Sequence, residues 1–247
     1  MEVANNAQHY KLRSNVRESA RDVLFQLYEY LGRPPFENFY PVKLKDIINS
    51  ILGWNLQEIP SIGQARYGDV FSSEPVLGKI DLEKKLITIN MGDTSEEVRN
   101  YTLAHEIGHL VLHQTTISCR GGSALRKRSV RRLKFENRDE FALKQEREAD
   151  IFASELLMPE KAVRKQFNTT FSRKAIRAQS TFVLKLYERQ ISDSFSRRPS
   201  IDQSNPLAVA RYLATFKPDP NVISLTEFFD VSREAMSFRL VELELVF

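Results

Sequence analysis

The sequence predicts a mainly helical α+β fold, with one small sheet beside a long helix and a helical region at the C-terminal end. Two observations favour this class. Apolar residues recur at helical spacing over most of the chain, whereas one stretch, residues 76–90, alternates as a β-hairpin does. That stretch is followed by a long apolar helical pattern that carries a His-x-x-x-His pair. The 247 residues suffice for one sizeable core, or for one domain plus a smaller one.

Composition indicates an ordinary globular protein of a reducing compartment. Hydrophobic residues make up 42% of the chain and charged residues 28%, both usual values for such proteins. The single cysteine, Cys119, excludes an intramolecular disulfide and suits the cytosol. Residues 1–14 contain no signal-peptide h-region, and no apolar run approaches the ~20 residues of a membrane span. We therefore expect a cytoplasmic protein that has no membrane partner.

Two helices are predicted before the hairpin. Residues 15–31 are amphipathic at helical spacing, and Gly32 with the prolines that follow ends the pattern. A second helix is predicted over residues 44–52, where Gly53 supplies its end.

The predicted hairpin turns at residues 83–85. Its strands offer four aliphatic side chains for burial, namely Ile80, Leu82, Ile87 and Ile89. The second strand ends at Asn90, just before the long helix. Such a strand could pair with an extended peptide substrate by adding it at a sheet edge.

The long helix is expected to begin at Thr94, whose hydroxyl and Glu97 three residues later form a capping-box pattern. Gly108 interrupts the helix at a cost of roughly 1 kcal/mol. Its presence indicates close approach by a neighbouring helix or by a metal site. The apolar residues of the helix are numerous enough to be buried on more than one side: Val98, Leu103, Ile107, Leu110, Val111 and Leu112.

Residues 105–109, His-Glu-Ile-Gly-His, are the feature with the most chemical content. Residues four apart lie on one face of a helix, so His105 and His109 can reach a single Zn²⁺. Glu106 then lies beside the metal, where it can act as the catalytic base. The chain has four histidines, and two of them fall in this pattern. The alternative is an ordinary helix that carries two histidines by chance.

A catalytic zinc takes three protein ligands and leaves its fourth position for water, so another ligand is required. His113 is the nearest candidate, but it lies about 12 Å of helical rise beyond His105. A metzincin site is excluded because Thr115 stands where that motif needs its third histidine. We therefore expect His113 to support a ligand through a hydrogen bond, or to pack beside one.

A better third ligand is Glu146. It lies three residues before a predicted buried helical stripe, and a carboxylate on an apolar face is costly unless it is paired or binds metal. Asp150 shares that face and could orient a ligand imidazole. Glu148 points roughly 200° away from Glu146 and is expected to be solvated. The alternative for Glu146 is an ordinary surface salt bridge. The stripe consists of Ala149, Phe152, Ala153 and Leu156.

The sequence resembles the ImmA/IrrE family of zinc metallopeptidases in three stretches and in their order along the chain. The stretches are residues 86–90 (LITIN), 101–113 (YTLAHEIGHLVLH) and 146–159 (EREADIFASELLMP). That family has a strand ending in Asn before its active helix. An F-T-L-A-H-E-L-G-H-x-x-L-H stretch follows, and an E-x-x-A-N-x-F-A-x-x-L-L-M-P stretch lies downstream. The departures are small: Tyr101 replaces a usual Phe, and Asp150 replaces a frequent Asn.

The resemblance implies a fold, a cofactor and an activity. It implies a zincin-like metallopeptidase domain over residues 1–165, with a basic insertion at about 114–140, followed by a helical region over 166–247. Glu146, rather than Glu148, matches the position of the third zinc ligand. The implied activity is that of a cytosolic zinc endopeptidase. Its implied substrate is a helix-turn-helix transcriptional repressor, whose cleavage relieves repression.

A second class of function stays open: a non-hydrolytic, zinc-containing regulatory protein that binds a repressor or DNA. The presence of Glu106 argues against it, because a structural zinc site closes its fourth position with protein and needs no base. An exopeptidase would need a pocket for a free chain terminus, and the sequence does not reveal one.

Residues 120–134 are strongly basic. Between residues 114 and 135 there is no acidic side chain, and without this segment the net charge of +4 would be negative. The segment could contact phosphates or an acidic partner weakly, it could guard the entrance of the site, or it could be a solvated loop. Its basic residues are Arg120, Arg126, Lys127, Arg128, Arg131, Arg132 and Lys134.

The C-terminal region is predicted to be helical. Residues 161–167 and about 171–189 have helical patterns, and residues 192–206 have the composition of a linker. Ser224 begins a capping box and Ser232 can cap a second helix, so residues 222–247 resemble a helix-turn-helix unit. Such a unit either binds DNA or serves as a packing or dimerisation pair. Its only basic residues are Arg233 and Arg239, which are few for a DNA reader.

Overall fold

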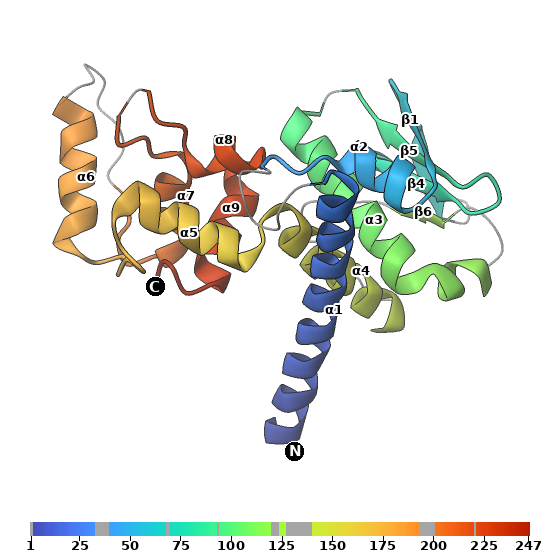
Figure 1. Cartoon of the computed structure of the whole chain (residues 1–247), viewed down its shortest axis with the longest axis horizontal. Helices are drawn as coiled ribbons and strands as arrows, with labels where there is room; N and C mark the ends of the chain where they lie inside the picture. Colours follow the sequence, from blue (N-terminus) through green and yellow to red (C-terminus); the bar gives the residue numbers. More distant parts are fainter. Residues whose placement is uncertain are drawn as a thin grey trace. The chain divides into compact units, whose positions relative to one another are not determined.

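The computed structural model describes residues 2–32, 40–67, 70–92, 94–119, 124–126, 140–192, 201–219 and 221–247. The chain forms two compact units, Met1–Leu157 and Met158–Phe247. It is mainly helical, and a small sheet lies beside helix α3 (Glu96–Cys119), so the predicted α+β class is confirmed (Figure 1). Within the described residues, no helix has the length and apolar character that a membrane crossing requires.

Three helices form the body of the first unit: α1 (Glu2–Tyr30), α3 (Glu96–Cys119) and α4 (Glu140–Leu157). Helix α4 packs against both α1 and α3, because its apolar stripe and the apolar faces of the other two must leave water together. Helix α1 begins well before the predicted residue 15. The core between these helices contains Ala20, Leu24, Leu27, Leu103, Ile107, Ala149, Phe152 and Leu156, all buried.

The predicted helix over residues 44–52 is only partly regular. Helix α2 (Leu44–Asp46) covers one turn and continues as η1 (Ile47–Ile51), a π-helical turn. Gly53 follows with φ 66°, a left-handed conformation that suits glycine and ends the helix as predicted.

The predicted hairpin is confirmed: β4 (Gly78–Asp81) and β5 (Leu86–Asn90) pair antiparallel, with Gly78 opposite Ile89. In the four-stranded sheet β5 has β1 (Asn55–Ile59) on its other side, parallel to it, and β4 has β6 (Ala124–Arg126). The strand before the long helix is therefore internal. The prediction that a peptide could add to that strand is wrong, because both of its edges are already paired.

Two features of this unit differ from expectation or were missed. Helix α3 begins at Glu96, so Ser95 rather than Thr94 takes the N-cap position. A hydrogen bond from the Ser95 side chain lowers the pKa of Glu97. A second hairpin, β2 (Gln64–Tyr67) with β3 (Val70–Pro75), was not predicted.

The second unit contains five helices in its described part: α5 (Glu160–Phe171), α6 (Thr181–Ser192), α7 (Pro206–Thr215), α8 (Leu225–Phe229) and α9 (Arg233–Glu242). Helix α7 was not predicted, although Asn205 caps it and Pro206 occupies its first turn. Residues 172–180 are not helical, so α6 begins later than the predicted residue 171.

The helix-turn-helix-like tail forms as predicted. Ser224 and Glu227 make a reciprocal capping box at the start of α8, and Ser232 accepts a hydrogen bond from the Ala235 amide at the start of α9. Asp230 connects the two helices with φ 52°. Both α8 and α9 pack against α7 within this unit.

Candidate metal centre

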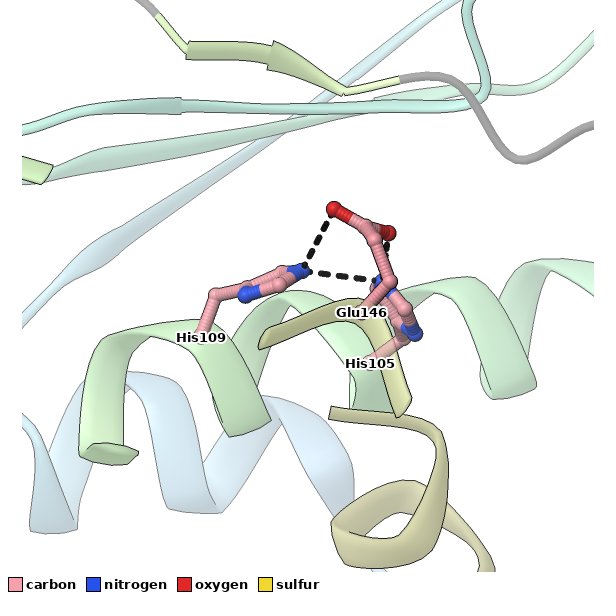
Figure 2. A group of neighbouring side chains, drawn as sticks. All are labelled: His105, His109 and Glu146. Atoms are coloured by element: carbon pink, nitrogen blue, oxygen red, sulfur yellow. Dashed lines mark hydrogen bonds and ion pairs between the residues drawn. The ribbon is translucent and has the colours of Figure 1, made fainter. Parts of the chain in front are cut away.

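Two helices bring the three predicted ligands together. His105 and His109 lie one turn apart on α3, and Glu146 reaches them from α4. One ligand atom from each residue lies within 4.8 Å of the other two. Figure 2 shows the carboxylate of Glu146 facing both imidazole rings. In the described part of the chain, this is the one group of at least three His, Cys, Asp or Glu side chains close enough to share an ion.

The distances suit a tetrahedral zinc ion. Ligand atoms about 2.0–2.1 Å from a tetrahedral ion stand about 3.3 Å from one another. Here the Nε2 atoms of His105 and His109 are 3.0 Å apart, and His105 Nε2 is 3.3 Å from Glu146 Oε2. His109 Nε2 is 3.7 Å from Glu146 Oε1. Two imidazoles and one carboxylate are a donor set of catalytic zinc sites, in which the fourth position stays open. The residues therefore fit the metal.

Electrostatics within the group favour a cation. Burial raises the pKa of Glu146, but hydrogen bonds from His105 and His109 outweigh it, and the pKa is lowered overall. Burial lowers the pKa of His105, but hydrogen bonds to Asp150 and Glu146 outweigh it and raise the pKa to about 9. In the metal-free protein a proton on His105 thus takes the place of the positive charge that a metal would supply.

Asp150 orients His105. Its Oδ1 lies 2.9 Å from Nδ1 of the imidazole, on the side of the ring that faces away from Glu146. A carboxylate at this position keeps a proton on Nδ1 and leaves the Nε2 lone pair for a metal. The structure therefore places Asp150 where the sequence predicted it to orient a ligand.

His113 contacts His109 in an equivalent manner. The Nδ1 atoms of the two rings lie 3.1 Å apart, and His113 Nε2 is 2.7 Å from Glu148 Oε2. When His109 uses Nε2 for the metal, its Nδ1–H donates to Nδ1 of His113. His113 then carries its own proton on Nε2 and donates it to Glu148. Both candidate histidine ligands thus have their second nitrogen engaged by a protein group.

The structure corrects the prediction for Glu148. Its side chain is 12% exposed and pairs with His113, so it is not a solvated surface group. Glu146 and Glu148 both reach histidines of α3 from α4, so the expected divergence of their side chains does not make Glu148 a surface group. The one signal in the sequence was His113, a histidine that needed a partner.

Glu106 lies on α3 between the two histidines in sequence, and its side chain is buried. It is not part of the three-residue metal group. Strand β4 packs over this part of α3, so the Glu106 carboxylate lies between the helix and the sheet. The charge of Glu106 is close enough to His105 to help raise the pKa of that imidazole.

Comparison with known families agrees with this geometry. The family model described as IrrE N-terminal-like domain, from peptidase family M78, matches residues 52–184. That range is more than half of the chain, and it contains β5, α3 and α4 with all three residues of the metal group. No curated protein matches the chain.

Proposed function

The chain belongs to the IrrE N-terminal-like family of metallopeptidases, and from this premise we propose that it is a zinc-dependent endopeptidase that cuts a helix-turn-helix transcriptional repressor. The observation that supports the zinc-dependent activity is the convergence of His105, His109 and Glu146, with a buried Glu106 whose charge acts on His105. The family alone supports a metallopeptidase type of enzyme. The donor set and its distances support zinc.

The residues of the site have separate roles in the proposed mechanism. His105, His109 and Glu146 would hold Zn²⁺, which supplies Lewis acidity to activate water and to polarise the peptide carbonyl. Glu106 accepts the proton of the attacking water and later delivers it to the leaving amine. Asp150 and His113 keep the two imidazoles in the tautomer and orientation that metal binding needs.

The substrate class rests on the resemblance of residues 86–90, 101–113 and 146–159 to the ImmA/IrrE family. Cleavage of a repressor would release its operator DNA and relieve repression, in the cytoplasm. Strand β4 lies beside Glu106, and an extended peptide that pairs with this strand would have to use the edge on which β6 now lies.

The alternative, a non-hydrolytic protein that holds DNA through its tail, has less support. Arg239 is 1% exposed, and its guanidinium donates to the Met158 carbonyl and to Glu242. It is therefore a structural residue of the second unit. Arg233 is then the one exposed arginine that the tail could offer to phosphates, and it pairs with Glu234. Apart from Ala124–Arg126, the basic segment 120–134 lies outside the described residues.

The test compares the wild type with Glu106→Gln at equal zinc loading, using repressors of the helix-turn-helix class and mass spectrometry of the fragments. Glu96→Gln is the matched control, because Glu96 is an exposed glutamate on the same helix. We expect about one zinc per chain in all three proteins and cleavage by all except Glu106→Gln. Zinc retention with no cleavage of any repressor by the wild type would favour the non-hydrolytic alternative. A folded protein that binds no zinc would overturn the proposal.

A further inference from the structure

Gly78, the first residue of β4, lies against the side chain of Glu106. A Cβ built on Gly78 would lie 2.8 Å from Oε1, 2.9 Å from Cγ and 3.1 Å from Cδ of Glu106. Separations below 3.0 Å are closer than real Cβ atoms approach other heavy atoms. The space that a side chain would need at residue 78 is therefore occupied by the proposed catalytic base.

The backbone does not by itself require glycine here. The described glycines with positive φ are Gly32, Gly53 and Gly63, and Gly78 is not among them. Its conformation is that of an ordinary strand residue, which alanine adopts without strain. Close approach to another group is the remaining common reason for glycine inside a strand, and Glu106 is that group.

The strand cannot easily move away from Glu106. The Asn90 side chain donates to the Val76 carbonyl at 3.0 Å, and the Asn90 amide donates to the Leu77 carbonyl at 2.9 Å. Asn90 is itself buried, and its own side-chain oxygen accepts from the Gly92 amide. Two consecutive carbonyls just before Gly78 are thus held by one buried residue, so a side chain at residue 78 would displace the carboxylate rather than the strand.

We propose that Gly78 is a positioning residue, whose missing side chain lets the backbone of β4 hold the Glu106 carboxylate in its working position. This inference rests on the proposed peptidase function for its kinetic consequence, but the contact itself does not. A general base must stand within hydrogen-bond reach of the proton that it removes, and a displacement of about 1 Å can cost about 100-fold in rate. The three atoms nearest to a Cβ at residue 78 all belong to Glu106 and none to a candidate metal ligand, so zinc binding is separable from the effect.

The kinetic test is Gly78→Ala in the zinc-loaded protein. We expect kcat for repressor cleavage to fall about 10- to 100-fold, while KM and zinc content stay within about twofold of the wild type. A general structural defect would instead lower zinc content or raise KM. Cleavage by Gly78→Ala at the wild-type rate would overturn the positioning role.

A second test needs no activity. Thermal unfolding is measured for the wild type, Gly78→Ala, Glu106→Ala and the double variant, all at equal zinc loading. We expect Gly78→Ala to lower Tm in the presence of Glu106. In the Glu106→Ala background it should leave Tm unchanged or raise it, because alanine at a compatible φ restricts the unfolded chain. If Gly78→Ala changes Tm equally with and without the Glu106 side chain, the proposed contact between residue 78 and Glu106 is overturned.

Gly108→Ala is the matched control. A Cβ there would lie 3.1 Å from Phe152 Cδ1 and 3.2 Å from the Ala149 carbonyl, so its clash is with α4 and not with Glu106. Its effect on Tm should be the same with and without Glu106→Ala. If the effects of Gly78→Ala and Glu106→Ala on Tm are coupled but no form of the protein cleaves a repressor, the contact is supported and the peptidase proposal is overturned. Failure of the proposed contact can therefore be distinguished from failure of the proposed peptidase activity.

Discussion

The Nδ1 atom of His113 lies 3.1 Å from the Nδ1 atom of His109, one helical turn earlier on α3. His113 is 5% exposed, and Glu148 holds its other nitrogen at 2.7 Å. A group that engages the second nitrogen of a ligand histidine determines both its tautomer and its ring orientation. His113, the histidine just outside the His-x-x-x-His pair, therefore supports a residue of the candidate metal centre without being one of its three ligand groups.

Replacement of His113 should weaken zinc binding. His113→Phe removes the acceptor for His109 Nδ1–H, and loss of such support typically lowers metal affinity about 10- to 100-fold. Titration against a chelator of known affinity measures the change. Lys144→Ala is the control, because the Lys144 ammonium lies 3.9 Å from Oε1 of Glu148, the oxygen that does not pair with His113. Unchanged affinity in His113→Phe would show that His109 needs no such support.

The metal-free protein should lose stability between about pH 6.5 and 9. The pKa of His105 is raised to about 9, above the ordinary value of 6.5 that it has when unfolded. Its contribution to stability is therefore fully present below about pH 6.5 and lost as the pH rises through about 9. Zinc must displace this proton, so the rise in Tm on adding zinc should increase over the same range.

The Asp150→Asn variant distinguishes the contribution of His105 to the pH dependence of stability from the contributions of other groups that titrate near pH 9. The variant removes the charge that helps to raise the pKa of His105, so its metal-free Tm should depend less on pH than that of the wild type. Thermal unfolding in excess chelator at pH 6.5, 7.5 and 9 provides the comparison. Parallel curves for the two proteins would contradict the assignment to His105.

The parts of the site that could be predicted from sequence depend on spacing within one helix. His105 and His109 share a face by their separation of four, and Glu146 stands out as a carboxylate beside an apolar stripe. Glu148 and Gly78 could not be found in this manner. Their roles depend on which segments pack together: α4 against two helices, and β4 over Glu106. No periodicity within a segment contains that information.

The fold shows the same limit. The hairpin at residues 78–90 follows from alternation and a turn, but the place of β5 inside the sheet depends on its pairing with β1, which is distant in sequence. Helix α7 was missed because its Asn205-Pro206 start resembles a linker until the buried residues after it are known.

Arg239 should be a stability residue of the second unit. Its buried guanidinium donates to the Met158 carbonyl at 3.0 Å and to Glu242 at 2.8 Å. Arg239→Met should lower the free energy of unfolding of that unit by about 2–4 kcal/mol, because both acceptors lose their partner. Urea unfolding measures this. Arg233→Ala, at an exposed position, should change it by no more than about 0.5 kcal/mol.

The edge of β4 should have to be free for cleavage. Lys79 and Leu125 lie directly opposite each other in the β4–β6 pair. A disulfide between Lys79→Cys and Leu125→Cys, in a Cys119→Ser background, would hold β6 on that edge and exclude an extended peptide from it. We expect oxidation to lower cleavage about tenfold or more and reduction to restore it, with zinc content unchanged. The control pair is Asp81→Cys with Leu86→Cys, which links β4 to β5 and leaves the edge unaffected. Equal cleavage by the oxidised and reduced forms of the Lys79–Leu125 variant would mean that the substrate reaches Glu106 without pairing with β4.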